Sequence, residues 1–365
     1  MRWLMRLPRL ARSVGLFRTS DDTDAPKDLR SNLGRRIFSL PTLLSLGVAG
    51  AFIFFIASGI DLDWSDTLQN VSEMKAWPYV IALVLYYSSF LFRGYRWKIL
   101  ARSAAKKTDP EGTTISLPSI LRFSQLIIMG WFVNTIAWLR LGDAYRAWAF
   151  SDDSKGGFSW GLGTLLAERA LDMATVALLL VISVLAATAT TDNAALQYLL
   201  IAAAGMATGL VGLLAAMRLF GMRLAVLLPG KLQRIYRGVH QGTLGSIELR
   251  QLPLLTLLSV IGWGLEAGRL YFVIDALGLT LSLPMVMIVA LGHALLSTVP
   301  TPGGIGAVET GMTGLLILSM PKSDAASVAV LDRSITLLSV MVFGGAIFLL
   351  NGIVQGRQAR KRATL

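Results

Sequence analysis

The feature that most constrains this chain is a break rich in proline and glycine inside an apolar run. The segment Val299–Glu309, VPTPGGIGAVE, contains two prolines and three glycines between long hydrophobic stretches. Proline and glycine interrupt helices, and lipid offers no partner for the backbone N–H and C=O groups that an interruption exposes. Protein, water or a ligand must satisfy those groups, and broken helices at membrane depth are typical of transport sites.

The composition predicts an all-α polytopic membrane protein. Hydrophobic residues make up 54% of the chain, which is far more than a soluble domain of this length needs. The chain has no cysteine, which excludes disulfides and thiolate metal ligands, and its only histidines are His240 and His293. We therefore expect no metal, no other cofactor and no catalytic residue.

Apolar stretches long enough to cross a bilayer, about 20 residues each, predict six spans. They cover approximately residues 39–60, 77–95, 160–187, 196–217, 252–277 and 328–352. Two further apolar regions, 118–149 and 284–320, contain polar or Gly/Pro interruptions and are expected to form re-entrant helical hairpins. Two full crossings in each region are the alternative, and they would leave every other element on the same side.

The charge pattern predicts the orientation of these spans, because Lys and Arg accumulate in cytoplasmic loops. With the N-terminus in the cytoplasm, five basic segments lie inside: Arg2–Arg36, Arg93–Lys107, Arg140–Lys155, Arg218–Arg250 and Arg357–Arg362. Only Lys75 and Lys322 remain outside. The net charge of +12 is thus a topology signal, and we do not expect a nucleic-acid partner. We expect both termini to be cytoplasmic in a bacterial inner membrane.

This layout divides the chain into three parts. Residues 1–38 form a basic N-terminal segment, residues 39–355 an integral membrane domain for lipid transport, and residues 356–365 a basic cytoplasmic tail. In the first part, apolar and arginine side chains recur on opposite helical faces, which predicts an amphipathic helix on an anionic lipid surface. A disordered basic tail is the alternative.

Two parts of the membrane domain, about 77–187 and 252–352, repeat the same ordered features. SLP occurs at Ser116–Pro118 and again at Ser282–Pro284, and each copy is followed by a glycine and an acid–arginine pair. From Gly142 to Glu168 is 168 − 142 = 26 positions, and from Gly306 to Asp332 is 332 − 306 = 26. Three predicted crossings separate the two units, so the second is inverted. Inverted repeats predict alternating access to a site near the bilayer midplane.

Seven charged residues fall well inside predicted spans, away from the span ends, where each is costly unless it is paired or hydrated. They are Glu168, Arg169, Asp172, Glu266, Arg269, Asp332 and Arg333. Some of them, such as Glu266 with Arg269 and Arg169 with Asp172, are three apart on one helix and would neutralise each other as structural pairs. Structural pairing is the alternative to the role that we expect for six of the seven, which is binding of an anionic group by Glu168, Arg169, Glu266, Arg269, Asp332 and Arg333.

The predicted hairpin tips offer further binding groups. If Thr301 caps a helix that Pro302 opens, the free N–H groups beside Gly303 and Gly304 suit a phosphate. Glu309, within two turns of that helix start, would bind a cation, carry a proton or satisfy the glycine-rich backbone. At the other tip, on the cytoplasmic side, the flanking residues are Arg140, Asp143 and Arg146. His293 is expected to be packed or hydrogen-bonded.

These motifs resemble the transmembrane lysylphosphatidylglycerol synthase/flippase family over approximately residues 40–355. The resemblance rests on RGYRWKIL (Arg93–Leu100), NTIAWLRLGDAYR (Asn134–Arg146), ERALD (Glu168–Asp172) and PTPGGIGAVE (Pro300–Glu309). The family places a proline where Trp138 stands and a glutamate where Asp143 stands, which bears on headgroup selectivity at that tip. The matching positions are Arg140, Asp143, Arg146, Glu168, Arg169, Gly303, Gly304 and Glu309.

The resemblance implies a lipid flippase without the soluble synthase domain. The substrate would be a phospholipid, aminoacylated or anionic, or a polyprenyl-linked lipid, and the arginines would hold its phosphate. A membrane enzyme that uses Glu168, Glu309 or Asp332 as a general base is the alternative, although arginine neighbours weaken these carboxylates as bases. A non-transporting partner of a lipid-modifying enzyme is a third reading. The protein could also form a homo-oligomer.

Overall fold

The computed structural model describes residues 64–188 and 229–363, with isolated residues between 201 and 221. All regular elements in this described part are helices, which confirms the all-α class. The predicted N-terminal segment 1–38 and the span 39–60 lie outside the described residues, as does most of the span 196–217.

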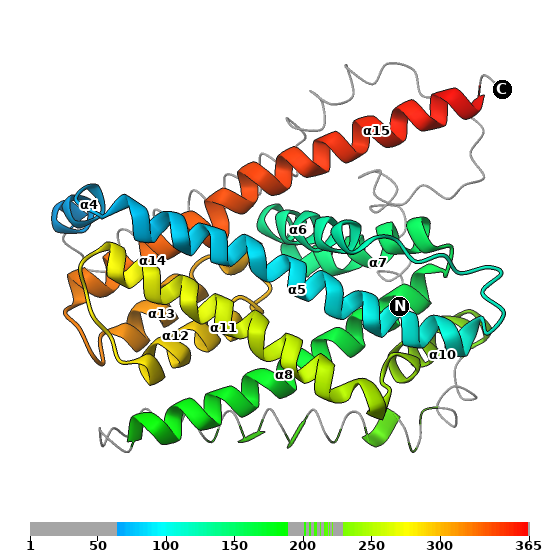
Figure 1. The fold of residues 1–365 in the computed structure, drawn as a ribbon, viewed down its shortest axis with the longest axis horizontal. Coiled ribbons are helices and arrows are strands. Elements are labelled where there is room, and N and C mark those ends of the chain that lie inside the picture. The colour runs from blue at the N-terminus through cyan, green and yellow to red at the C-terminus, as the bar shows by residue number, and fades with distance from the viewer. Residues whose placement is uncertain are drawn as a thin grey trace. The chain divides into compact units, whose positions relative to one another are not determined.

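The helices follow one another in the order shown in Figure 1. They are α4 (Trp64–Ser72), α5 (Ala76–Thr108), α6 (Ile120–Ile136), η1 (Trp138–Arg140), α7 (Leu141–Ser154), α8 (Phe158–Thr188), α10 (Gly230–Ser246), η2 (Leu249–Gln251), α11 (Leu252–Ala276), α12 (Leu283–Leu296), η3 (Pro302–Gly304), α13 (Ala307–Leu316), α14 (Lys322–Arg333), the π-helix η4 (Ser334–Gly344) and α15 (Gly345–Ala363).

Three helical stretches in the described part are long and apolar enough to cross a membrane: Phe158–Thr188, Leu249–Ala276 and Lys322–Val354. They coincide with the predicted spans 160–187, 252–277 and 328–352. The third continues without interruption from α14 through the π-helix into α15. The membrane class of the protein is therefore supported by the helices themselves.

Helix α5 differs from its sequence prediction. The apolar stretch 77–95 was expected to end in a cytoplasmic loop at Arg93–Lys107, whereas α5 runs unbroken for 33 residues to Thr108. Arg93 and Arg96 are only 6% and 2% exposed, because acidic side chains from distant helices neutralise them. Because these ion pairs compensate the buried charges, α5 can continue through the protein interior at both arginines.

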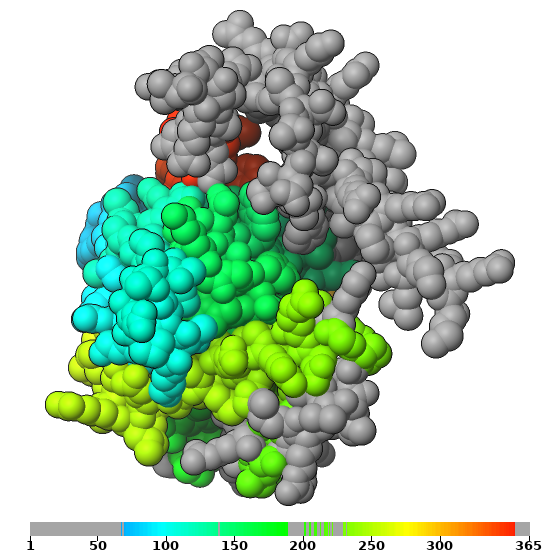
Figure 2. All heavy atoms as spheres, turned by 90° about the vertical axis from the view of Figure 1, so that its right-hand side faces the viewer, coloured from blue at the N-terminus to red at the C-terminus, as the bar shows by residue number. Residues whose placement is uncertain are grey.

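Helices α5 and α11 form an antiparallel pair at the centre of the described part (Figure 1). At one end Lys75 N donates to Ala276 O at 2.8 Å, and at the other Ser103 Oγ donates to Gln251 Oε1 at 2.9 Å. Helix α10 packs across α8 and the C-terminal part of α5, and Figure 2 shows these segments together on one face.

The regions 118–149 and 284–320 each form a pair of α-helices separated by a short break, as the sequence predicted. In the first pair α6 and α7 flank the short turn η1, and in the second pair α12 and α13 flank η3. The first pair begins and ends near the C-terminal end of α5, where Ser116 N donates to Ser154 O. The second begins after the C-terminus of α11, at the opposite end of α5 (Figure 1).

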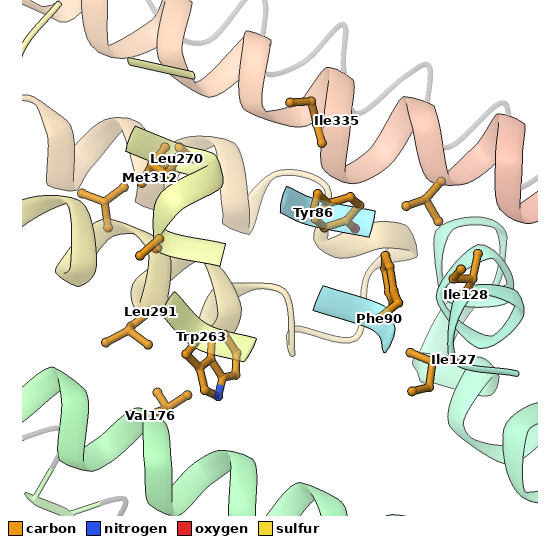
Figure 3. Close-up of a cluster of buried hydrophobic side chains, with 14 of the residues drawn as sticks. Tyr86, Phe90, Ile127, Ile128, Val176, Trp263, Leu270, Leu291, Met312 and Ile335 are labelled. Atoms are coloured by element: carbon orange, nitrogen blue, oxygen red, sulfur yellow. The ribbon is translucent and has the colours of Figure 1, made fainter. Parts of the chain in front are cut away.

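One hydrophobic core includes side chains of α5, α6 and α11. Tyr86 and Phe90 of α5 lie between Ile127 and Ile128 of α6 on one side and Leu270 of α11 on the other, as Figure 3 shows. Between membrane helices, such contacts stabilise the fold through van der Waals packing. The core holds the ends of the two broken pairs in fixed positions.

Candidate functional site

The two helix breaks meet each other. Leu139 N of η1 donates to Pro300 O at 3.4 Å, and Arg140 Nη1 donates to Ser297 O at 2.6 Å. Both breaks use left-handed backbone: φ is 59° at Leu139 and 52° at Arg140, and 60° at Gly303. Such angles are unfavourable for residues other than glycine and are frequent at functional sites.

The helix that follows the second break begins later in the chain than the sequence suggested. Thr301 makes no capping bond, and Pro302–Gly304 forms only a short turn, so α13 starts at Ala307 with Gly306 as its N-cap. The positive φ values of Gly303, Gly304 and Gly306 explain the delay, because these residues turn the chain before a helix can start. The prediction that Pro302 opens the helix is therefore wrong.

Glu309 satisfies the backbone at this break and also binds an arginine. Its Oε2 accepts from Gly306 N at 2.6 Å, and its Oε1 accepts from Arg333 Nε at 2.7 Å. Arg333 Nη2 in turn donates to Gly303 O at 2.8 Å. Of the roles considered for Glu309, the structure places it on the glycine-rich backbone.

The first break has a matching arrangement. Asp143 is the third residue of α7, as Glu309 is of α13, and its Oδ1 accepts from Arg169 Nη2 at 2.8 Å. Arg140 Nε lies 3.7 Å from Asp143 Oδ2. In each unit, an arginine directly follows an acidic residue in a long helix. Its side chain binds another acid, in the first turn of the helix that begins after the break.

The flanking residues of the first break contact other helices inside the fold. Arg140 and Lys155 lie at opposite ends of α7, and Arg140 contacts the second broken pair. Arg146 is 1% exposed and its Nη2 lies 2.6 Å from Glu168 Oε2.

The predicted structural pairs have mixed outcomes. Glu266 and Arg269 do pair on α11, at 3.2 Å, and Arg93 Nη2 lies 3.3 Å from the same carboxylate. Arg169 and Asp172 instead bind separate partners. Asp172 Oδ1 lies 2.7 Å from Arg96 Nη2, and Arg169 binds Asp143 as described above. Buried pairs across different helices therefore replace the expected pair along one helix.

Asp332 is the most enclosed acid of the second unit, with no exposed side-chain surface. It pairs with Arg269 through Nη1, and its Oδ2 lies 3.0 Å from His293 Nδ1. His293 thus has an ionisable neighbour, and its burial agrees with the expectation that it is packed.

A cavity lies between the two breaks and the long helices. The space open to the centres of water molecules in it is about 100 Å³. Five arginines line it, against two carboxylates, Asp172 and Glu266. The arginines are Arg93, Arg140, Arg169, Arg269 and Arg333. Asp143, Asp332 and Glu309 pair with arginines of the lining but do not themselves line the cavity.

Six of the predicted site residues line this cavity: Arg140, Arg169, Glu266, Arg269, Gly303 and Arg333. Five others lie behind the lining as ion-pair partners: Asp143, Arg146, Glu168, Glu309 and Asp332. Pro302 and Gly304 are buried in the second break. No trio of acidic and histidine side chains suited to a metal occurs among the described residues.

Sequence reasoning missed several groups that line the cavity. Arg93 was assigned to a loop, yet its guanidinium lies 4.7 Å from the Trp263 ring centre and 5.6 Å from that of Trp131. Asn134 and Thr135 also line the cavity, from the last turn of α6. The three-residue spacing of Arg93 and Arg96 at the end of an apolar run was the available signal.

Comparison with known proteins agrees with this architecture. The family described as "Lysylphosphatidylglycerol synthase TM region" matches residues 42–344, which confirms the resemblance drawn from the motifs. The UPF0104 membrane protein MJ1078 of Methanocaldococcus jannaschii is 29% identical over 219 residues, 60% of this chain and 93% of the relative. The UPF0104 membrane protein PH1989 of Pyrococcus horikoshii is 25% identical over 340 residues, 85% of this chain and 96% of the relative.

Proposed function

Because the chain belongs to the family of the lysylphosphatidylglycerol synthase transmembrane region, we propose that it moves a phospholipid, or a polyprenyl-linked lipid, between the two leaflets of a membrane. One observation carries this proposal: five arginines from both units line a single cavity where two broken helices meet. The cavity would hold the phosphate while the acyl chains remain in lipid.

Arginine suits this task because its planar guanidinium binds phosphate through two parallel hydrogen bonds. Hydrogen bonds to a charged group contribute about 1.5–3 kcal/mol each. The partners Asp143 and Glu309 hold Arg169 and Arg333 in place before the lipid arrives. A site ordered in advance loses less conformational entropy on binding.

The fold supports movement by alternating access. The two units, about 77–187 and 252–352, carry broken helix pairs that extend from opposite ends of α5 and touch at their breaks. We propose that they form an inverted repeat with two re-entrant hairpins and about six full spans. Rocking of one unit against the other would open the cavity to each side in turn.

Two further assignments follow from this mechanism. The membrane is the cell's inner membrane, with both termini in the cytoplasm, as the basic loops predict. The carboxylates are not catalytic, because those of the cavity and its surroundings have an arginine within ion-pair distance. An arginine partner stabilises the ionised form and makes a carboxylate a weak base.

The proposal is tested with purified protein in lipid vesicles. A panel of fluorescent lipids with different headgroups, placed in the inner or outer leaflet, is followed by chemical quenching from outside. Phospholipids should change leaflet faster than in protein-free vesicles, whereas a labelled diacylglycerol, which lacks phosphate, should show no difference attributable to the protein. Equal acceleration of both lipids, or of neither, would contradict the proposal.

A further inference from the structure

Three elements of the second unit meet at one buried cluster of charged and titratable groups. His293 of α12 lies 3.0 Å from Asp332 of α14, and Asp332 also pairs with Arg269 of α11. The Asp332 side chain is fully buried, whereas that of His293 is 11% exposed and lines the cavity. His293 therefore connects a buried acid to the cavity.

The corresponding cluster of the first unit has no titratable cation. There Glu168 lies 2.6 Å from Arg146 and 3.7 Å from Arg96. Arginine stays protonated in proteins, so the charge of that cluster is fixed. In the second unit the acid has one arginine and one histidine as partners, and histidine is the side chain that changes charge near neutral pH. Of the two clusters, only that of the second unit can gain a proton, on its histidine, without losing an ion pair.

Several charged groups face His293 besides Asp332. Helix α11 contributes Arg269 and Glu266, and α14 contributes Arg333, whose partner Glu309 belongs to α13. Across the cavity stand Arg169 and Asp172 of α8 and Arg93 of α5. The arginines oppose protonation of the imidazole, and the acids favour it. A ligand that neutralises the arginines would therefore favour the proton.

We propose that His293 and Asp332 form a proton-binding site through which one proton moves together with each anionic lipid headgroup. This inference rests on the proposed lipid movement. A phosphate that accepts hydrogen bonds from Arg269 removes part of the counter-charge of Asp332. The imidazole, whose Nδ1 lies 3.0 Å from Asp332 Oδ2, takes a proton from cavity water at Nε2, and the resulting imidazolium restores that counter-charge.

The return step reverses these changes. When the headgroup leaves, Arg269 again neutralises Asp332, and the imidazolium releases its proton from Nε2 to water on the side to which the cavity has opened. Proton and headgroup favour each other's binding by the same factor, as linkage requires. For a lipid with one negative charge the transported pair is neutral.

The test uses vesicles that contain the protein, phosphatidylglycerol and a trace of fluorescent phosphatidylglycerol. With a pH difference of one unit, the labelled lipid should accumulate in the leaflet on the alkaline side, at a ratio of about 10:1 for one proton per lipid. A membrane potential set by potassium and valinomycin should not change that ratio. His293→Gln should abolish the accumulation, and so should Asp332→Asn.

His240 provides the matched control, because it is the only other histidine and contacts Met217 O outside the cavity. His240→Gln should accumulate lipid as the wild type does. Size-exclusion chromatography checks that each variant is folded. If His293→Gln is folded and still accumulates lipid, the proton site is wrong.

Two measurements on the wild type alone complete the test. An imposed leaflet excess of phosphatidylglycerol should move protons, reported by pyranine trapped in the vesicles, and absence of this movement overturns the proton site even if both variants unfold. If the lipid moves between the leaflets but does not accumulate on the alkaline side, the proton site is also wrong, whereas the proposed function stands. If no phosphatidylglycerol moves at all, the proposed function itself fails for this lipid, and the proton site with it.

Discussion

At the scale of single residues, Arg169 and Arg333 hold equivalent places, each bound to the acid in the first turn after a helix break. We predict that Arg169→Ala and Arg333→Ala each slow lipid movement by about tenfold or more, since one lost charged hydrogen bond costs about 1.5–3 kcal/mol. The quenching assay measures the rate, and a thermal unfolding curve measures the folded protein.

Arg102 is the control for this pair, because it is an exposed arginine on α5 outside the cavity lining. Arg102→Ala should leave the rate within about twofold of the wild type, as expected for surface substitutions. Normal movement in both cavity variants would show that these arginines do not bind the lipid. Loss of the folded state in both would assign them a structural role.

At the scale of elements, the second break depends on Gly304. Its φ is +69°, and a Cβ there would lie 2.9 Å from Val308 Cγ2 and 3.0 Å from Ser297 Cα. We predict that Gly304→Val stops lipid movement while the chain still inserts in the membrane, because strain of about 1–3 kcal/mol distorts the break. The obstruction comes from Val308 of α13 and from Ser297, the residue that follows α12.

Gly314→Ala is the matched control for Gly304, since it changes a glycine of the adjacent helix α13 where a Cβ meets no atom within 4 Å. It should retain movement and raise stability by a few tenths of a kcal/mol or more, up to about 1 kcal/mol, through helix propensity. Equal effects of the two substitutions in the unfolding and quenching assays would show that the break is not sensitive to its backbone.

The contact between the two breaks can be tested by cross-linking, since the natural chain has no cysteine. We predict that cysteines at Leu139 and Pro300, whose backbones lie 3.4 Å apart, form a disulfide that stops lipid movement until it is reduced. A disulfide between Ser116 and Ser154, at the base of the first pair, should not stop it. Undiminished movement with the first cross-link would contradict alternating access through this contact.

The elements that the sequence predicted well are those set by local chemistry. Proline and glycine located the break at 300–306, and apolar length located α8 and α11 within a few residues. The full length of α5 was missed because it depends on partners distant in the chain, and the beginning of α13 was missed because Gly303, Gly304 and Gly306 first turn the chain. Glu266 and Asp172, which neutralise Arg93 and Arg96, are more than 70 residues away from them. No local pattern reports such pairs.

At the scale of the whole molecule, the orientation in the membrane can be measured with single cysteines. Lys322 begins α14, whereas His240 lies on α10, which packs against the C-terminal part of α5. We predict that Lys322→Cys reacts with a membrane-impermeant maleimide in intact cells and that His240→Cys reacts only after the cells are opened. Thr190, predicted to share the outer side, lies outside the described residues.

Glu111→Cys is the control for the inner side, because the exposed loop after α5 should share the side of position 240. Labelling of positions 111 and 240 in intact cells, without labelling of 322, would reverse the proposed orientation. Labelling of all three from outside would remove a predicted crossing.

The stacking of Arg93 between Trp131 and Trp263 has a consequence for how this protein can be observed. Both indole rings line the cavity, and the guanidinium lies 5.6 Å and 4.7 Å from their centres. Indole emission shifts when a nearby charge moves or water enters. Intrinsic fluorescence, compared between the wild type and Trp263→Phe, should thus report occupancy of the cavity in real time, so the unlabelled protein contains its own optical sensor.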